Sequence, residues 1–542
     1  MALRSISSMP SAADVHGVSV LADENHAFEI DKADRGELTA IQGNARFHET
    51  VTAAPLNPWS RTSLQLYAIL LVAALNATAS GFDGSIFSSI NAMDQYKAYF
   101  HHAELGNMTG SFFTGPICDH FGRRIGIMAG SVLIMVGAAV QTAARDDSYL
   151  LGGRFVLGCG VAIGTSSAPT YALELSPPQW RARVVGYYNT FFYTGSILAT
   201  GVAYAANKTN SQLAFRLPLA LQLIPPLLIF TGAIFIPESP RWLTMKGEAD
   251  KAAGILAKYH GGGQPDHPMV RLQVREFEQS IELQKTSNAW NYRALISTHS
   301  ARWRFAMMAM MSVFAQLSGN SVLTYYLPSM YRLVGIETTE KRLLLTFVNS
   351  IISCAGAVAG SATNDAMGRR TKLWVGSVVL AGLFGGVTGF SSHFGDKTAK
   401  VSATFSGGGV AFIFLFGCAY SFVYTPLTAT YCAEVLDTAT RAKGMGVHVI
   451  LSNCANLYNT YVTAVALDAI DWRYYLVFVG LNLLYGAVWY VVGVETRGRT
   501  LEEMDEVFRA GFPPRAALRK AVMVRREGGR LHGLDGEEGG EG

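Results

Sequence analysis

Two copies of one short motif occupy equivalent places in the chain: DHFGRR at residues 119–124 and DAMGRR at residues 365–370. They lie about 246 residues apart. Two further motifs repeat at a similar offset: a glutamate seven residues before an arginine, and an acidic turn that reads PESPRWL from Pro237 and VETRGRTL from Val494. The glutamate and arginine pairs are Glu174 with Arg181 and Glu434 with Arg441. The repetition indicates two halves built on one plan.

The composition indicates a membrane protein. Half of the 542 residues are hydrophobic and only 15% are charged, whereas soluble domains carry about 25% charged residues. The formal net charge is only +4 and the basic residues are scattered over loops, which argues against nucleic-acid binding because that function needs a concentrated basic face. The six cysteines lie in or beside apolar runs without metal-ligand spacing, as is typical of thiols packed between helices. We expect no metal and no cofactor.

Apolar runs of membrane-spanning length follow one another along the chain. A bilayer core about 30 Å thick needs roughly 20 apolar residues in a helix. Eleven runs meet this requirement: 62–86, 125–145, 150–172, 183–205, 218–236, 303–327, 343–363, 372–392, 403–430, 444–468 and 472–493. A twelfth, in second place, ends in GNMTGSFFTGPICDHFGRR (106–124), and its apolar part is short. The sequence therefore predicts an all-α membrane protein with twelve transmembrane helices in two six-helix bundles, the second helix being truncated.

The charges of the loops predict the orientation in the membrane. Basic residues cluster in alternate loops when all twelve spans are counted, and the positive-inside rule places these loops and both termini in the cytoplasm. The predicted units are a disordered N-terminal tail (1–60), an N-terminal six-helix bundle (61–236), an intracellular helical loop domain (237–302), a C-terminal six-helix bundle (303–493) and a cytoplasmic tail (494–542). Parallel repeats with a site between them at the bilayer midplane are typical of rocking secondary transporters.

The repeated motifs place charged residues at cytoplasmic helix ends. Cations are favoured there and can reach acidic groups on neighbouring helices. We predict two charge networks that hold the halves shut when the transporter faces outward and break when it faces inward; the alternative is that the arginines only fix the topology. The predicted gate residues are Asp119, Arg123, Arg124, Glu174, Arg181, Glu238, Asp365, Arg369, Arg370, Glu434 and Arg441.

Together these motifs resemble the sugar porter family of the major facilitator superfamily. The resemblance rests on both D-x-x-G-R-R copies, PESPRWL, TRAKG (440–444) and VETRGRTLEE (494–503), and it covers roughly residues 60 to 505. GFDGSIFSSINAM (81–93) and QLSGNSVLTYYL (316–327) are similar to the fungal branch that contains lactose permeases and hexose transporters. The resemblance implies the major facilitator fold and sugar transport, and not an enzyme.

One acidic and one basic residue stand out within the N-terminal half. Asp83 lies near the outer end of the first span and Arg154 at the start of the fourth. A carboxylate at membrane depth is costly and usually functional, and desolvation makes its protonation easier. We predict that Asp83 and Arg154 form a couple that exchanges a proton as the site opens, and proton-coupled sugar porters resemble this sequence at both positions. The alternative is that Asp83 lies at the water interface and caps a helix.

The seventh span carries the polar groups that a sugar site requires. A sugar presents hydroxyl groups and apolar faces, so its site needs amides and aromatic rings with few charges. Gly319 would allow the helix to break among such residues. The resemblance adds Asn189 in the fifth span and Asn456 in the eleventh, and it places Ala429 where many relatives carry tryptophan, which favours a bulkier substrate or a different pose. The predicted sugar-binding residues are Asn189, Gln316, Asn320, Ser321, Tyr325 and Asn456.

The leading expectation is a monomeric plasma-membrane transporter in contact with the lipid bilayer, which carries a hexose or a lactose-like disaccharide together with a proton by alternating access. Three alternatives stay open. The protein could be an uncoupled facilitator, or a non-transporting sensor, although sensors of this family carry a long signalling tail and the tail after Arg497 is short. It could also be a defective member, because the segment between Tyr99 and Pro116 is shorter than the repeat predicts for a complete second span, unless the helix recruits HHAEL (101–105).

Overall fold

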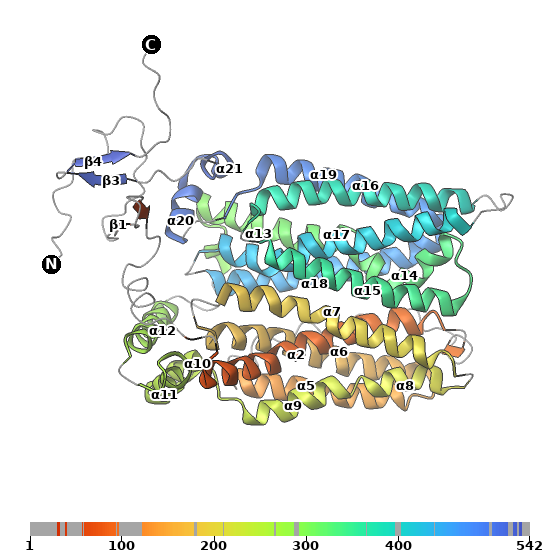
Figure 1. Cartoon of the computed structure of the whole chain (residues 1–542), viewed down its shortest axis with the longest axis horizontal. Coiled ribbons are helices and arrows are strands. Elements are labelled where there is room, and N and C mark those ends of the chain that lie inside the picture. Colours follow the sequence, from red (N-terminus) through yellow and green to blue (C-terminus); the bar gives the residue numbers. More distant parts are fainter. Residues whose placement is uncertain are drawn as a thin grey trace, which may run out of the picture.

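The chain forms an elongated bundle of long helices that run side by side in the computed structural model (Figure 1). The structure describes residues 30–32, 38–40, 57, 59–93, 95–96, 122–177, 181–209, 211–264, 267–286, 292–364, 366–395, 403–437, 440–497, 501–518, 524–527 and 530–533. The predicted truncated helix, between Tyr99 and Pro116, lies outside these residues. Its length is therefore still a prediction.

The helices follow the order that the apolar runs predict. The N-terminal half contains α2 (Arg61–Ile90), α5 (Arg123–Thr142), α6 (Asp147–Leu175), α7 (Arg181–Ala206), α8 (Leu213–Leu221) and α9 (Ile224–Phe235). The C-terminal half contains α13 (His299–Leu317), α14 (Asn320–Leu333), α15 (Thr339–Ala362), α16 (Arg369–Gly395), α17 (Ala403–Val435), α18 (Arg441–Ile470), the 3-10 turn η5 (Asp471–Arg473) and α19 (Tyr474–Val492). Two predicted spans are each built from two helices, α8 with α9 and α13 with α14.

Shorter elements lie between and after the two halves. The central loop forms α10 (Pro240–Met245), α11 (Ala249–His260), α12 (Pro268–Thr286) and the 3-10 turn η4 (Tyr292–Leu295). After the last span come α20 (Leu501–Arg509) and α21 (Pro513–Ala516). The tails carry two antiparallel hairpins, β1 (Ile30–Lys32) with β2 (Leu38–Ala40) and β3 (Val524–Glu527) with β4 (Arg530–Gly533). All these elements lie at the end of the bundle where α2 begins (Figure 1).

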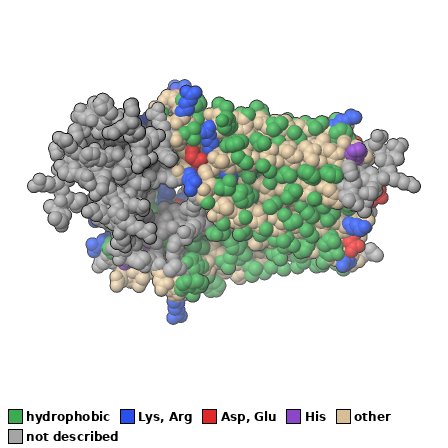
Figure 2. Space-filling view, turned by 45° about the horizontal axis from the view of Figure 1, so that its top comes forward, with side chains coloured by type: hydrophobic (Ala, Val, Ile, Leu, Met, Phe, Trp, Pro, Cys, Tyr) green, Lys and Arg blue, Asp and Glu red, His purple; other side chains and the backbone are tan. Residues whose placement is uncertain are grey.

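Length and composition suit the long helices for a bilayer. Among the described residues, nine helical segments are long and apolar enough to cross a membrane. Helices α7 and α18 have 26 and 30 residues and span the bundle as well. Figure 2 shows a broad band of hydrophobic side chains around the middle of the body, with charged side chains gathered at its two ends. Such a band fits contact with lipid, because a soluble protein would expose it to water.

Each half packs tightly around its own pairs of helices. In the N-terminal half α5 lies along α6 and α2 along α7. The second pair is very close, since a Cβ atom on Gly81 would lie 1.9 Å from the carbonyl oxygen of Phe192, and one on Gly195 1.9 Å from that of Thr78. In the C-terminal half α16 lies along α19 and α15 along α17. The halves meet where α7 packs on α15 and α17 and where α2 packs on α14.

Candidate functional site

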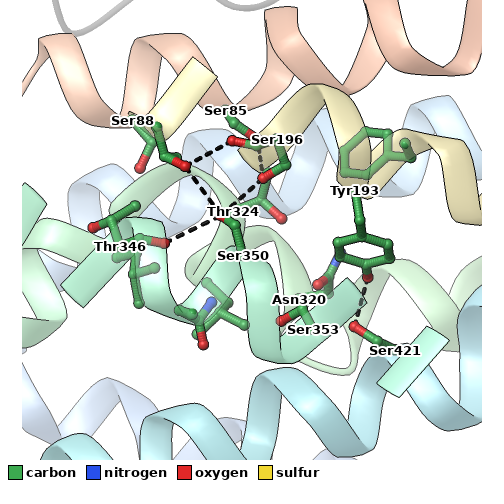
Figure 3. A pocket seen from close by; sticks show the side chains of 15 residues that line it. Ser85, Ser88, Tyr193, Ser196, Asn320, Thr324, Thr346, Ser350, Ser353 and Ser421 are labelled. Atoms are coloured by element: carbon green, nitrogen blue, oxygen red, sulfur yellow. Dashed lines mark hydrogen bonds between the residues drawn. The ribbon is translucent and has the colours of Figure 1, made fainter. Parts of the chain in front are cut away.

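A polar cavity lies at the junction of the two halves. It is lined from α2 and α7 on one side and from α14, α15 and α17 on the other (Figure 3). Twelve of its fifteen lining side chains carry a hydroxyl or amide group: Ser85, Ser88, Tyr193, Ser196, Thr200, Asn320, Thr324, Thr346, Asn349, Ser350, Ser353 and Ser421. The other three are Phe192, Leu323 and Leu327. The described lining therefore offers hydrogen-bond donors and acceptors and apolar surface, and contains no charged side chain.

The seventh span breaks beside this cavity. Gly319 separates α13 from α14 with φ of 103°, a left-handed conformation that side chains other than glycine rarely adopt. Three carbonyl groups at the break accept hydrogen bonds from neighbouring helices: Ala315 from Tyr420 at 3.0 Å, Gln316 from Asn459 at 2.9 Å and Ser318 from Asn482 at 2.9 Å. These bonds provide partners for backbone carbonyl groups at membrane depth, and the Ala315 carbonyl also accepts from Ser318 Oγ at 3.0 Å.

The predicted sugar-binding residues divide into three groups. Asn320 lines the cavity. Ser321 donates to Asn456 Oδ1 at 2.8 Å, and Asn456 is also a hydrogen-bond partner of the Tyr325 side chain. These three residues form a polar cluster between α14 and α18. The remaining two make backbone contacts: the carbonyl of Gln316 accepts from Asn459, and Asn189 Nδ2 donates to the carbonyl of Thr425 at 3.4 Å.

Asp83 and Arg154 lie in direct contact inside the N-terminal half. Arg154 Nη1 donates to Asp83 Oδ1, and the side chains are 8% and 16% exposed respectively. The guanidinium group also stacks on the Phe87 ring at 3.7 Å. Asp83 is an interior residue of α2, which continues to Ile90, so it does not cap that helix. If the charge of one partner were removed, the charge of the other would stay buried without this ion pair, which is costly.

Gln222 completes the environment of Asp83. Its Nε2 donates to Asp83 Oδ1 at 2.8 Å, and the residue is 2% exposed. It lies where the sixth span breaks between α8 and α9, close to Pro218 and Pro225. The sequence analysis did not predict Gln222, because no sequence pattern distinguishes a neutral amide at a helix break from other polar residues.

A charge network lies at the end of the N-terminal half where α5 begins. Glu174 Oε2 lies 3.2 Å from Arg123 Nε and accepts from Ser239 Oγ at 2.5 Å. Glu238 Oε1 accepts from the backbone amides of Arg123, Arg124 and Ser239 at 2.9 to 3.1 Å. This carboxylate therefore caps the start of α5, where the N–H groups have no partner within the helix.

The C-terminal half repeats this network. Glu434 accepts from Arg369 Nη2 at 3.2 Å and from Thr496 Oγ1 at 2.5 Å. Glu495 accepts from the backbone amides of Arg369 and Arg370 at 2.7 and 3.1 Å and from that of Thr496 at 3.1 Å. The side chains of Arg124 and Arg370 make equivalent contacts in the two halves. Each donates to the backbone carbonyl of at least one residue near the end of a neighbouring helix.

Each of these bonds joins residues of the same half. These bonds therefore tie helix ends together within each half, and a role in gating would act through movements of whole bundles. Asp119 and Asp365 lie outside the described residues. Arg181 begins α7, and Arg441 Nη2 donates to the Leu436 carbonyl at 3.2 Å. The gating role of the eleven residues is still a prediction.

Comparison with known proteins identifies the family. Residues 67–508 match the family described as "Sugar (and other) transporter". The chain belongs to this transporter family. Solved structures agree in fold: the proton:xylose symporter XylE bound to 6-bromo-6-deoxy-D-glucose aligns with a TM-score of 0.65 over 83% of this chain and 100% of that chain, at 20% identity. The predicted all-α major facilitator fold is thus confirmed for this multi-pass membrane transporter.

The transporter has relatives with different stated substrates. A high-affinity glucose transporter of Kluyveromyces lactis is 25% identical over 500 residues, which cover 87% of this chain and 90% of the relative. The MFS-type transporter criB of Aspergillus cristatus is 29% identical over 81% of this chain and 92% of its own length. A quinate permease of Neurospora terricola is 26% identical over 82% and 89%. Family membership alone therefore does not fix the substrate.

Several lining residues of the transporter's cavity escaped prediction from the sequence. Helix α15 contributes Thr346, Asn349, Ser350 and Ser353, whose spacing of three, four and seven residues places them on one helical face. That polar stripe was visible in the sequence and could have been found by its periodicity. Periodicity could not have revealed the other serines of the lining, Ser85, Ser196 and Ser421, because single serines are common in membrane helices that pack closely.

Replacement of Glu238 by alanine tests the capping role in the transporter. The change removes one acceptor from three backbone amides, and leaving buried donors unpaired costs about 1–3 kcal/mol. We expect a lower melting temperature in detergent, measured by scanning fluorimetry. Glu248→Ala is the matched control, because Glu248 is exposed and pairs only with Lys251. Equal melting temperatures for the two variants would show that Glu238 does not stabilise the cytoplasmic end.

Proposed function

We propose that this protein imports a neutral sugar together with a proton by alternating access between its two six-helix bundles. The observation that carries the proposal is the hydroxyl-rich and amide-rich cavity between the halves, with a buried ion pair of Asp83 and Arg154 in the adjoining helices. The expected substrate is a hexose or a lactose-like disaccharide.

The chemistry of the cavity supports a polyhydroxylated and uncharged substrate. Hydroxyl and amide groups can both donate and accept, so they match the ring of hydroxyl groups on a sugar. A carboxylated substrate such as quinate would require a cation, since an unpaired charge is costly to bury. Arg154 is already engaged by Asp83 and Phe87. Glucose-like substrates therefore suit the described lining better than quinate does.

Proton coupling is supported by the position of Asp83. Its carboxylate is held by Arg154 and Gln222 and is largely withdrawn from water. Protonation would remove the charge that these two groups bind and so weaken their contacts with α2. Tyr325 belongs to α14, which packs on α2, and its side chain shares a hydrogen bond with Asn456. This side chain offers a physical connection between the protonation site and the polar cluster on α14 and α18.

The repeated cytoplasmic networks support movement of each half as a rigid body. Two glutamates in each half accept hydrogen bonds from a neighbouring helix end of the same half. They are Glu174 and Glu238 in the N-terminal half and Glu434 and Glu495 in the C-terminal half. Bundles stabilised in this way can rock about a site at the midplane, as parallel-repeat transporters do. The basic loops favour cytoplasmic termini. We place the transporter in the plasma membrane as a monomer.

An uptake assay in yeast lacking its own hexose transporters tests the function. We expect accumulation of radiolabelled sugar from a panel of glucose, galactose, xylose, lactose and cellobiose, with alkalinisation of the medium. Equilibration without alkalinisation would favour an uncoupled facilitator. Binding without uptake would favour a sensor, and neither binding nor uptake at confirmed surface expression would favour a defective member.

Asn320→Ala should specifically weaken sugar recognition. Loss of hydrogen bonds from one cavity amide is expected to raise KM for the accepted sugar roughly tenfold with little change in maximal rate. Gln212→Ala is the control, because Gln212 is an exposed amide at the start of α8. An unchanged KM in the Asn320 variant would place the sugar elsewhere.

A further inference from the structure

Helix α7 holds the C-terminal half through a row of polar contacts along its length. Towards its Arg181 end, Gly186 and Thr190 contact Ser361 of α15. Farther along, Ser196 and Thr200 contact Ser350 of α15. Between these two groups lies Tyr193, which reaches α17 instead (Figure 3). Tyr193 and, one turn earlier, Asn189 thus join α7 to α17, whereas the other residues of the row join it to α15.

The hydroxyl group of Tyr193 makes a directed bond. Its oxygen lies 2.6 Å from Ser421 Oγ and 3.3 Å from Thr425 Oγ1. Ser421 donates its own proton to the carbonyl of Gly417 at 2.7 Å. Ser421 Oγ is therefore left as an acceptor, and Tyr193 is the donor. Ser421 is 1% exposed, so a broken bond would leave a buried oxygen without this donor.

Tyr193 also marks the cytoplasmic boundary of the cavity. On α7 the lining residues are Phe192, Tyr193, Ser196 and Thr200, so Phe192 and Tyr193 are the described lining residues nearest to Arg181. On α17 the lining residue is Ser421, and Thr425 lies one turn nearer to the helix end at Val435. The Tyr193 contact therefore closes the side of the cavity that faces the predicted cytoplasm.

We propose that Tyr193 is the inner latch of the cavity and presents its ring to the bound sugar. The proposal rests on the proposed function in so far as it names sugar as the occupant. Opening towards the cytoplasm requires α7 and α17 to separate at this level, which breaks the hydroxyl contact with Ser421 and Thr425. The latch thus stabilises the closed conformation relative to the inward-open one, and a contact present in only one state shifts their populations.

Tyr193→Phe tests the latch, because it removes the hydroxyl group and keeps the ring. Loss of one net hydrogen bond should shift the conformational population about fivefold towards the inward-open state. In hydrogen–deuterium exchange of the purified protein, we expect faster exchange in peptides covering residues 183–193 and 421–435. In vesicles, KM for external D-glucose should rise about fivefold, because fewer molecules present the outward site.

A double-variant cycle makes the test specific. Ser421→Ala should reproduce most of the faster exchange, because the contact of the Tyr193 hydroxyl with Thr425 at 3.3 Å remains. The double variant should match Tyr193→Phe, because the bond to Ser421 can be lost only once. Tyr187→Phe is the matched control on the same helix, since the Tyr187 ring is 47% exposed. Exchange in Tyr193→Phe that equals this control, or additive effects in the double variant, would overturn the latch.

The exchange measurement separates the latch from the proposed transport. Wild-type vesicles that take up none of the panel sugars would contradict the proposed function. Faster exchange in Tyr193→Phe would still support the latch in that case. Uptake by wild type with unchanged exchange in the variant would contradict the latch alone.

Discussion

Asp83→Asn is expected to abolish proton-driven accumulation of sugar and to leave exchange intact. A membrane potential of 100 mV contributes 2.3 kcal/mol per proton, so one coupled proton supports roughly fiftyfold accumulation. Asparagine cannot take up or release that proton. The accumulation ratio of the variant should therefore fall to about one, measured with radiolabelled sugar in energised vesicles.

The surroundings of Asp83 explain why exchange should survive. Asparagine resembles the protonated carboxyl group in size, and its amide oxygen can still accept from Gln222, which now lies 2.8 Å away. Exchange of labelled for unlabelled sugar needs only the sugar-loaded transporter, in which the proposed mechanism has Asp83 protonated. Arg154 loses its charged partner in the variant, which costs stability. It loses the same partner whenever the proposed mechanism has Asp83 protonated, and its contact with Phe87 remains.

An exposed carboxylate near the same end of the bundle provides the control. Asp146 precedes α6 and is exposed, so Asp146→Asn should accumulate sugar as wild type does. Full accumulation by Asp83→Asn would show that the proton is carried by another group. Failure of the wild type to accumulate a sugar that it exchanges would identify an uncoupled facilitator.

Gly319→Ala is expected to produce the largest loss of stability. The residue has φ of 103°, and a Cβ atom there would lie 2.2 Å from Cε2 of Phe384. A left-handed conformation costs other residues about 1–2 kcal/mol, and overpacking a dense core costs typically about 1–3 kcal/mol. The combined loss is therefore about 2–5 kcal/mol. Phe384 is fully buried and its ring packs against Phe416 and Phe478.

Thermal unfolding in detergent measures this effect. Gly382→Ala is the matched control, because it lies within α16 and a Cβ atom there meets nothing within 4 Å. That substitution should be neutral or slightly stabilising, since alanine favours helix over glycine. A similar melting temperature for both variants would mean that the break at Gly319 can relax without cost.

Much of the fold could be predicted from the sequence, because the bilayer restricts the backbone conformations that a spanning segment can adopt. Apolar runs such as 372–392 predict a helix that the structure extends over Arg369–Gly395, because backbone groups at membrane depth must bond within a helix. The repeated motifs predicted equivalent charge networks at one end of both halves. The sequence also predicted that the seventh span can break at Gly319, because glycine adopts backbone conformations that other residues rarely adopt.

The candidate site was only partly predictable. Asp83 and Arg154 could be paired in advance, because they are the strong charges well inside the N-terminal half and a buried charge requires a partner. The side chains that donate to the carbonyl groups at the helix break could not be predicted. They are Tyr420, Asn459 and Asn482, which come from three separate helices. Nothing in a local pattern indicates which distant amide or hydroxyl will reach a given carbonyl.

The sequence by itself determined the membrane class, the twofold repeat, the broken seventh helix and the charged residues that must be compensated. These follow from periodicity and from the cost of burying polar groups, which act locally. Tertiary structure alone decided that each charge network stays within one half, that Gln222 joins Asp83, and that Tyr193 reaches across to Ser421. Those contacts depend on the rotation and separation of whole helices, which are set by packing between surfaces far apart in the chain.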